Sequence, residues 1–174
     1  MSENEATAGL RGAGWDPSLM NRPHKVVPAT LGTADGSKTM GFLFTVTGDE
    51  TAVVSVMHPR EFQLSHYLVP AILDAGCACW VQAPRAIGND LRLEHEIALF
   101  DVAAGLAHLR KLGFSKIALL GNSGGAPLYA LYNQQSKLAP EQRIERTPGG
   151  RPTKLAELDM PVADGIIFVA PHGG

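Results

Sequence analysis

A serine flanked by glycines stands out in the middle of the sequence. Gly121, Ser123 and Gly125 form a Gly-x-Ser-x-Gly pattern within the stretch IALLGNSGGAPLYALY. A serine hydroxyl becomes an effective nucleophile when it is exposed on a strained turn and a base takes its proton. Glycines let the backbone bend sharply, and the first amides of a following helix stabilise negative charge. The pattern predicts a nucleophile at Ser123; the alternative is a glycine-rich turn without chemistry.

The segments on either side of Ser123 favour the catalytic interpretation. Residues 116–121 are an apolar run typical of a buried strand. A helix is expected to begin at Gly124 or Gly125 and to run to about Lys137. A serine at a strand-to-helix junction is where this chemistry requires it.

Two other functions that use glycine-rich loops do not fit. A dinucleotide-binding Gly-x-Gly-x-x-Gly would need glycine at positions 123 and 126, where serine and alanine stand, and the Lys-Ser/Thr pair of a phosphate-binding loop is missing. GNSGG resembles the motif of chymotrypsin-like proteases, and His58 mimics their histidine. That fold consists of two β-barrels and needs a longer chain, whereas this serine opens a helix.

The elements that must position Ser123 follow an alternating order of strands and helices. Runs without polar alternation are typical of strands buried on both faces, and here they cover 51–57, 78–83, 116–121 and 165–170. Two earlier strands, 24–31 and 40–47, flank the turn residues Asp35-Gly36 and should pair antiparallel. The fold class predicted is α/β, with a mostly parallel sheet, antiparallel first strands and helices on both faces.

Two further helices are expected between these strands. The stronger covers about 91–112 and ends at Gly113, and a shorter one covers 66–75. His95 and His108 fall on the polar side of the longer helix and are expected to be solvated.

The chain is expected to form one domain with a polar start. Residues 1–23 are interpreted as a flexible arm, 24–174 as a partial α/β domain, and 138–162 as an exposed excursion rich in proline and glycine. The core is expected to bury Val54, Val56, Trp80, Ile117, Leu119, Ile167 and Val169.

Composition excludes several classes of protein. Of the 174 residues 45% are hydrophobic, and the net charge of −2 offers no basic face for nucleic acid or an anionic membrane. No apolar run has the length of a membrane span. Cys77 and Cys79 are expected to be free thiols of a cytoplasmic protein. No ligand spacing for a metal is present, and no cofactor is expected.

From about residue 24 to its last residue the chain resembles the α/β-hydrolase superfamily of serine esterases and lipases. The resemblance rests on the first two strands, the strand ending His58-Pro59-Arg60, the long helix, the Ser123 turn, and the strand ending Ala170-Pro-His-Gly-Gly. It implies that the backbone amides of Arg60 and Gly124 form an oxyanion hole, although Pro59 replaces a glycine usual there. The Arg60 side chain is open to two interpretations, an anchor for an anionic substrate group or a surface residue.

The resemblance also implies a base that the sequence does not supply in the usual place. In the family a catalytic acid and then a histidine follow the serine on later strands. After Ser123 the only histidine is His172, which is expected to line the pocket beside His58 and Asn122 rather than to act as the base. The acid and base are therefore expected beyond residue 174, and the chain is interpreted as the front part of a hydrolase, truncated after its sixth strand.

The function implied is a serine hydrolase acting on a small-molecule carboxylic ester or a related acyl bond. Alternatives are an acyltransferase or a carbon–carbon bond hydrolase on the same scaffold, or a non-catalytic protein. Substrate size and oligomeric state cannot be deduced from the sequence.

Overall fold

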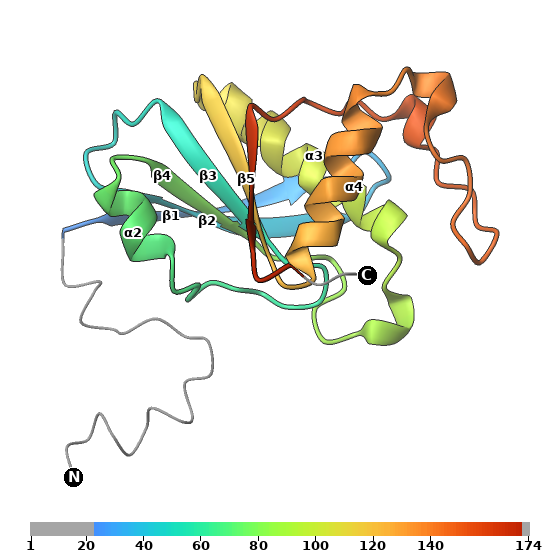
Figure 1. Ribbon diagram of the computed structural model, residues 1–174, viewed down its shortest axis with the longest axis horizontal. Coiled ribbons are helices and arrows are strands. Elements are labelled where there is room, and N and C mark those ends of the chain that lie inside the picture. Colours follow the sequence, from blue (N-terminus) through green and yellow to red (C-terminus); the bar gives the residue numbers. More distant parts are fainter. Residues whose placement is uncertain (1–22, 172–174) are drawn as a thin grey trace, which may run out of the picture.

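A six-stranded mixed sheet forms the centre of the structure, a computed structural model that describes residues 23–171 (Figure 1). The strands are β1 (Lys25–Gly32), β2 (Lys38–Thr45), β3 (Ala52–Met57), β4 (Ala78–Gln82), β5 (Lys116–Asn122) and β6 (Gly165–Val169). They lie in the order β1-β2-β4-β3-β5-β6. β2 pairs antiparallel with β1 and β4, while β4, β3, β5 and β6 run parallel. The prediction of a mostly parallel sheet with antiparallel first strands is confirmed.

Helices cover both faces of this sheet, as predicted. α3 (His95–Lys111) and α4 (Gly125–Lys137) pack on one face, and α2 (Val69–Asp74) packs on the other (Figure 1). The first face buries the larger apolar cluster, in which Trp80 and Leu119 of the sheet meet Leu99 and Tyr132 of the helices. Within residues 23–171 no helix has both the length and the apolar composition needed to cross a membrane.

α3 is shorter than its sequence pattern predicts. The expected start was near Leu91, but that side chain is 99% exposed and the helix begins at His95. Residues Asp90–Arg92 form a separate 3₁₀ turn. The prediction was wrong because a leucine extends an apolar pattern whether or not anything packs on it. The helix end is confirmed, since Gly113 follows it with φ of 97°.

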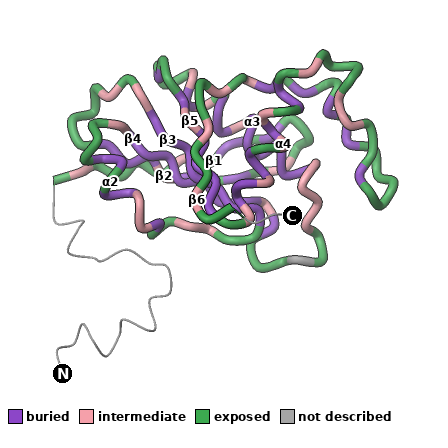
Figure 2. The backbone as a smooth tube through the Cα atoms, in the orientation of Figure 1, coloured by how far each residue is buried: buried purple, intermediate pink, exposed green. Residues whose placement is uncertain are grey.

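The core prediction holds for the central strands and fails at the edge. Five of the seven residues named are buried: Val54, Val56, Trp80, Ile117 and Leu119. Ile167 is 43% exposed, and Val169 is only partly buried. In Figure 2 the β6 strand is coloured as exposed or intermediate, whereas β3 and β4 are largely buried. The reason is position, because β6 pairs with β5 alone and its other edge has no neighbour among the described strands.

β6 is fastened to β5 at both ends. At its start the Asp164 carboxylate accepts hydrogen bonds from the Ile117 amide at 2.9 Å and from the Arg110 guanidinium at 2.7 Å. These bonds lower the pKa of Asp164 to about 2. At its end the Ser123 amide donates to the Val169 carbonyl at 3.0 Å, so the serine is held beside this strand.

The segment 138–162 is irregular, as predicted, but it is not wholly exposed. It contains two 3₁₀ turns, η3 (Pro140–Gln142) and η4 (Leu155–Glu157). Most of the segment is exposed, as predicted, but Leu155, Leu158 and Met160 are buried in the larger cluster. These three apolar side chains fold back onto the sheet face. The polar, proline-rich composition of the segment did not indicate this burial. The predicted arm, residues 1–23, lies outside the described residues except for its last one.

Candidate active site

Ser123 occupies the turn between β5 and α4 in a backbone conformation that side chains rarely adopt. Its φ is 52°, in the left-handed region, and the residue is exposed. A non-glycine residue with this φ carries strain of about 1–3 kcal/mol, which persists only where the surroundings hold it. The Ser123 carbonyl accepts the Ala126 amide at 3.1 Å and so closes the turn into α4. The strained turn that the sequence predicts is present, at the carboxyl edge of the sheet.

The two flanking glycines are required by contacts between backbones. A Cβ atom on Gly121 would lie 2.6 Å from the Gly125 carbonyl oxygen, and one on Gly125 would lie 2.6 Å from the Met57 carbonyl oxygen. Real Cβ atoms do not approach backbone this closely. The glycines therefore let α4 start directly against β3 and β5, which is what projects Ser123 outward.

Ser123 opens into a cavity of about 630 Å³. The cavity is lined by the loop after β3, the start of α3 and the start of α4: His58, Pro59, Arg60, Leu93, His95, Glu96, Ser123, Gly124, Pro127 and Leu131. Four of the residues predicted for the site thus come together: Ser123, Gly124, Arg60 and His58.

His58 is buried between the loop after β3 and the turn at Ser123. Its Nδ1 atom accepts hydrogen bonds from the Arg60 and Glu61 amides, both at 3.2 Å. Its Nε2 atom lies against Gly124, where a Cβ atom would come within 2.8 Å of it. Burial holds the pKa of His58 below its usual range, so the ring is neutral at pH 7. With Nδ1 accepting, the hydrogen of the neutral ring is on Nε2.

This arrangement changes the expected oxyanion hole. The Arg60 amide, which the resemblance assigns to the hole, donates to His58 Nδ1 instead. Pro59 has no amide hydrogen to offer. The Gly124 amide belongs to the first turn of α4, where amides lack intrahelical partners. Gly124 is therefore the expected donor that remains available.

Asn122 does not line the cavity as predicted. Its side chain is buried and lies 3.1 Å from His66 Nε2, while the Leu68 amide donates to His66 Nδ1 at 3.3 Å. Successive residues of a strand alternate between faces, and Asn122 faces the side that α2 covers. Burial lowers the pKa of His66 to about 4. The other predicted lining residue, His172, lies outside the described residues.

His95 and Glu96 are site residues that the sequence analysis missed. His95 is half-buried and lines the cavity with Ser123, which contradicts the expectation of a solvated residue. His108 was also expected to be solvated but packs against Trp80, with ring centroids 5.3 Å apart. A signal for His95 did exist, because a crossover helix begins at the carboxyl edge of the sheet, where the serine also lies.

No proton acceptor is hydrogen-bonded to the Ser123 hydroxyl among residues 23–171, although His95 and Glu96 line the same cavity. No hydrogen bond joins the Ser123 hydroxyl to a histidine in this part of the chain, and the cavity-side nitrogen of His58 carries a hydrogen. The described residues also contain no group of three His, Cys, Asp or Glu side chains that could hold a metal ion.

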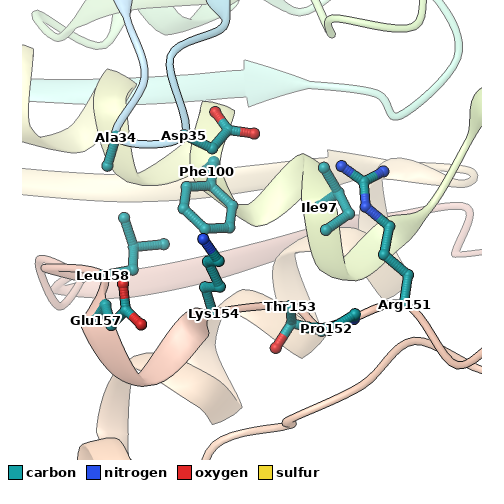
Figure 3. A pocket seen from close by; sticks show the side chains of 10 residues that line it. All are labelled: Ala34, Asp35, Ile97, Phe100, Arg151, Pro152, Thr153, Lys154, Glu157 and Leu158. Carbon is teal, nitrogen blue, oxygen red and sulfur yellow. The ribbon is translucent and has the colours of Figure 1, made fainter.

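A second cavity, of about 520 Å³, lies between α3 and the segment around η4 (Figure 3). Arg151, Lys154 and Glu157 reach into it from that segment, opposite Phe100 of α3. Arg151 is paired with Glu94 at 2.6 Å. Ser123 is not among its lining residues, so this cavity belongs to a different part of the surface.

Comparisons with known proteins concern the fold. No protein-family model and no curated protein matches the sequence. Among solved structures, the esterase Est22 has a TM-score of 0.66 at 19% identity, over 98% of this chain and 53% of that one. The Pyrococcus furiosus esterase Pf2001 has a TM-score of 0.54 at 20% identity, over 71% and 50%. A post-proline cleaving enzyme from Rickettsia typhi has a TM-score of 0.55 at 14% identity, over 64% and 19%.

The chain thus spans about half the length of these two esterases and 19% of the post-proline cleaving enzyme. At such identities the likeness concerns the fold alone, and this chain has the fold of the α/β-hydrolases.

Proposed function

We propose that the protein is a serine hydrolase acting on a carboxylic ester or a related acyl bond of a small molecule, with Ser123 as nucleophile. The observation that carries this proposal is the Ser123 turn: a left-handed φ of 52° on an exposed serine, between a buried strand and the start of a helix. Strained residues cluster at active sites, where the surrounding structure holds them in place. The hydrolytic activity of the fold's neighbours agrees with the proposal.

The chemistry is acyl transfer through a covalent intermediate. The Ser123 oxygen bonds to the carbonyl carbon, and the electron pair of the C=O π bond moves onto the carbonyl oxygen. The Gly124 amide, at the positive end of α4, donates a hydrogen bond to this oxyanion. The oxyanion then collapses, the carbon–oxygen bond to the alcohol breaks, and the alcohol leaves with a proton. Water cleaves the acyl-serine by the same route.

The hydroxyl proton needs an acceptor, which we assign to an imidazole outside the described residues. His58 is unsuited because its cavity-side nitrogen is protonated in the neutral ring. A site with a nucleophile and an oxyanion hole but a poorly placed base retains part of its rate enhancement.

The cavity offers both apolar and charged surroundings to the acyl and alcohol groups of a substrate. Leu93, Pro127 and Leu131 supply apolar walls near the serine, and the charged residues Arg60 and Glu96 also line it. The acceptor in the second step decides between hydrolase and acyltransferase: water gives the acid, and a bound alcohol gives a new ester.

Reaction of the purified chain with p-nitrophenyl acetate tests the proposal. We expect one acetyl group on the peptide that contains Ser123, detected by mass spectrometry, with little further turnover because release also needs the base. Ser123→Ala is the matched control and should remain unmodified at that peptide. Absence of acetyl at Ser123 in the folded protein, or equal modification of the control, would contradict the proposal.

A further inference from the structure

The oxyanion hole of this site has lost its second backbone donor. Tetrahedral intermediates are usually held by two or more hydrogen-bond donors. Here the Arg60 amide donates to His58 Nδ1 at 3.2 Å, and Pro59 has no amide hydrogen. The Gly124 amide alone would give the developing negative charge only one hydrogen-bond donor.

A different donor stands at the same place. His58 is 7% exposed, lines the cavity with Ser123, and has its Nε2 atom against Gly124. Two backbone amides occupy its Nδ1 lone pair, which fixes the tautomer with hydrogen on Nε2. Among residues 23–171 no acceptor takes this hydrogen. The Nε2–H is open to the cavity that His58 lines, where an oxyanion could accept its hydrogen bond.

We propose that the Nε2–H of His58 is the second donor of the oxyanion hole, beside the Gly124 amide. This inference rests on the proposed function, because it needs an oxyanion formed by attack of Ser123. His58 donates a hydrogen bond only and keeps its proton throughout, so the balance of the acyl transfer is unchanged. The loop after β3 orients the His58 ring, because the Arg60 and Glu61 amides donate to Nδ1 instead of contacting the substrate.

The assignment also accounts for the glycine that follows the nucleophile. A Cβ atom at position 124 would lie 2.8 Å from Nε2, 3.4 Å from Cε1 and 3.5 Å from Cδ2 of His58. The ring therefore uses the space that a side chain would occupy. This places the Nε2 atom of His58 beside the residue whose amide is the other proposed donor.

Two substitutions of His58 distinguish its proposed role as hydrogen-bond donor to the oxyanion from its role as acceptor for the loop amides. In His58→Asn the side-chain oxygen takes the place of Nδ1, accepts the two loop amides, and leaves no donor at the Nε2 position. In His58→Gln the side-chain NH₂ reaches the Nε2 position but the loop amides lose their acceptor. The readout is the rate of acetylation of Ser123 by p-nitrophenyl acetate. His108→Asn, on the far part of α3, is the control for a histidine-to-asparagine change.

The inference predicts that His58→Asn slows acetylation by about 100-fold or more, with the thermal midpoint unchanged. The acetylation rate should fall by less than about 10-fold in His58→Gln and should be unchanged in His108→Asn, because both variants keep a donor in the oxyanion hole. The reverse order, with His58→Gln slower than His58→Asn, would mean that His58 only holds the loop. If wild type is not acetylated at Ser123, the proposed function fails; if wild type and His58→Asn react equally fast, only this inference fails.

Nitrogen-15 NMR of the histidine side chains supplies a readout independent of activity. The inference requires the Nε2–H tautomer of His58 at pH 7, in which Nδ1 has the nitrogen-15 chemical shift of an unprotonated, hydrogen-bonded nitrogen. A hydrogen on Nδ1 would overturn it even if His58→Asn were slow.

Discussion

Gly125 passes so close to Met57 that a Cβ atom on the glycine would lie 2.6 Å from the methionine carbonyl oxygen. The first residue of α4 thus touches the last residue of β3, the strand that leads into His58. The second glycine of the Gly-x-Ser-x-Gly pattern is a packing requirement between two backbones. The same contact brings the serine turn and the His58 loop to one cavity.

This contact predicts the sign of the substitution Gly125→Ala. Helix propensity alone would make alanine stabilising by about 1 kcal/mol. The clash with the Met57 carbonyl should reverse this and destabilise the protein by about 1–3 kcal/mol. Denaturant unfolding measures the change, with Gly32→Ala as control, because a Cβ there would meet nothing within 4 Å. A more stable Gly125→Ala variant would refute the packing argument.

The central strand β5 should be far more sensitive than the edge strand β6. Leu119 is fully buried, and Leu119→Ala is expected to lower the free energy of unfolding by about 2–5 kcal/mol. Ile167→Ala, at a residue that is 43% exposed, should cost less than half as much. Denaturant unfolding of each variant, measured beside the wild type under the same conditions, gives both values. Similar losses would mean that β6 is as well covered as β5.

His66 should make stability depend on pH. Burial lowers its pKa to about 4, whereas the unfolded chain takes up the proton near pH 6.5. Between pH 6.5 and 4 the unfolded state therefore binds more protons, and stability falls as pH falls, by on the order of 2–3 kcal/mol. His66→Gln should flatten this part of the curve. Some slope should remain, because burial also lowers the pKa of His58 and His108.

The open edge of β6 should promote association. Ile167 and Phe168 are 43% and 51% exposed on a strand that has no outer neighbour within the described chain. Unpaired apolar edges pair with other chains. Sedimentation should show association that grows with concentration, and Phe168→Lys should reduce it while Lys116→Arg does not. A monomer at all concentrations would contradict this expectation.

Local patterns in the sequence predicted what local physics decides. Uninterrupted apolar runs located β3, β4, β5 and β6, and the glycines at 121 and 125 located the strained turn. The same patterns failed where burial depends on neighbours. Ile167 belongs to a run as apolar as that of Leu119, but only the latter has strands on both sides.

Contacts between distant segments were beyond the reach of sequence patterns. The contact of Asn122 with His66 joins residues 56 positions apart, and neither spacing nor composition indicates it. The tautomer of His58 depends on the path of the loop that follows it, which bends back so that two amides meet one ring nitrogen. The cavity-facing position of His95 follows from where α3 begins, four residues later than its apolar pattern suggests.

Covalent labelling by a fluorophosphonate tests the central claim, that Ser123 is an activated nucleophile, most directly. The reagent phosphonylates a serine whose oxygen attacks phosphorus with loss of fluoride, and digestion followed by mass spectrometry locates the modified residue. The account predicts a single modification, on the peptide from β5 to α4, absent in Ser123→Ala and absent after unfolding in denaturant. A folded protein that stays unlabelled at Ser123, or is labelled equally at other serines, would contradict it.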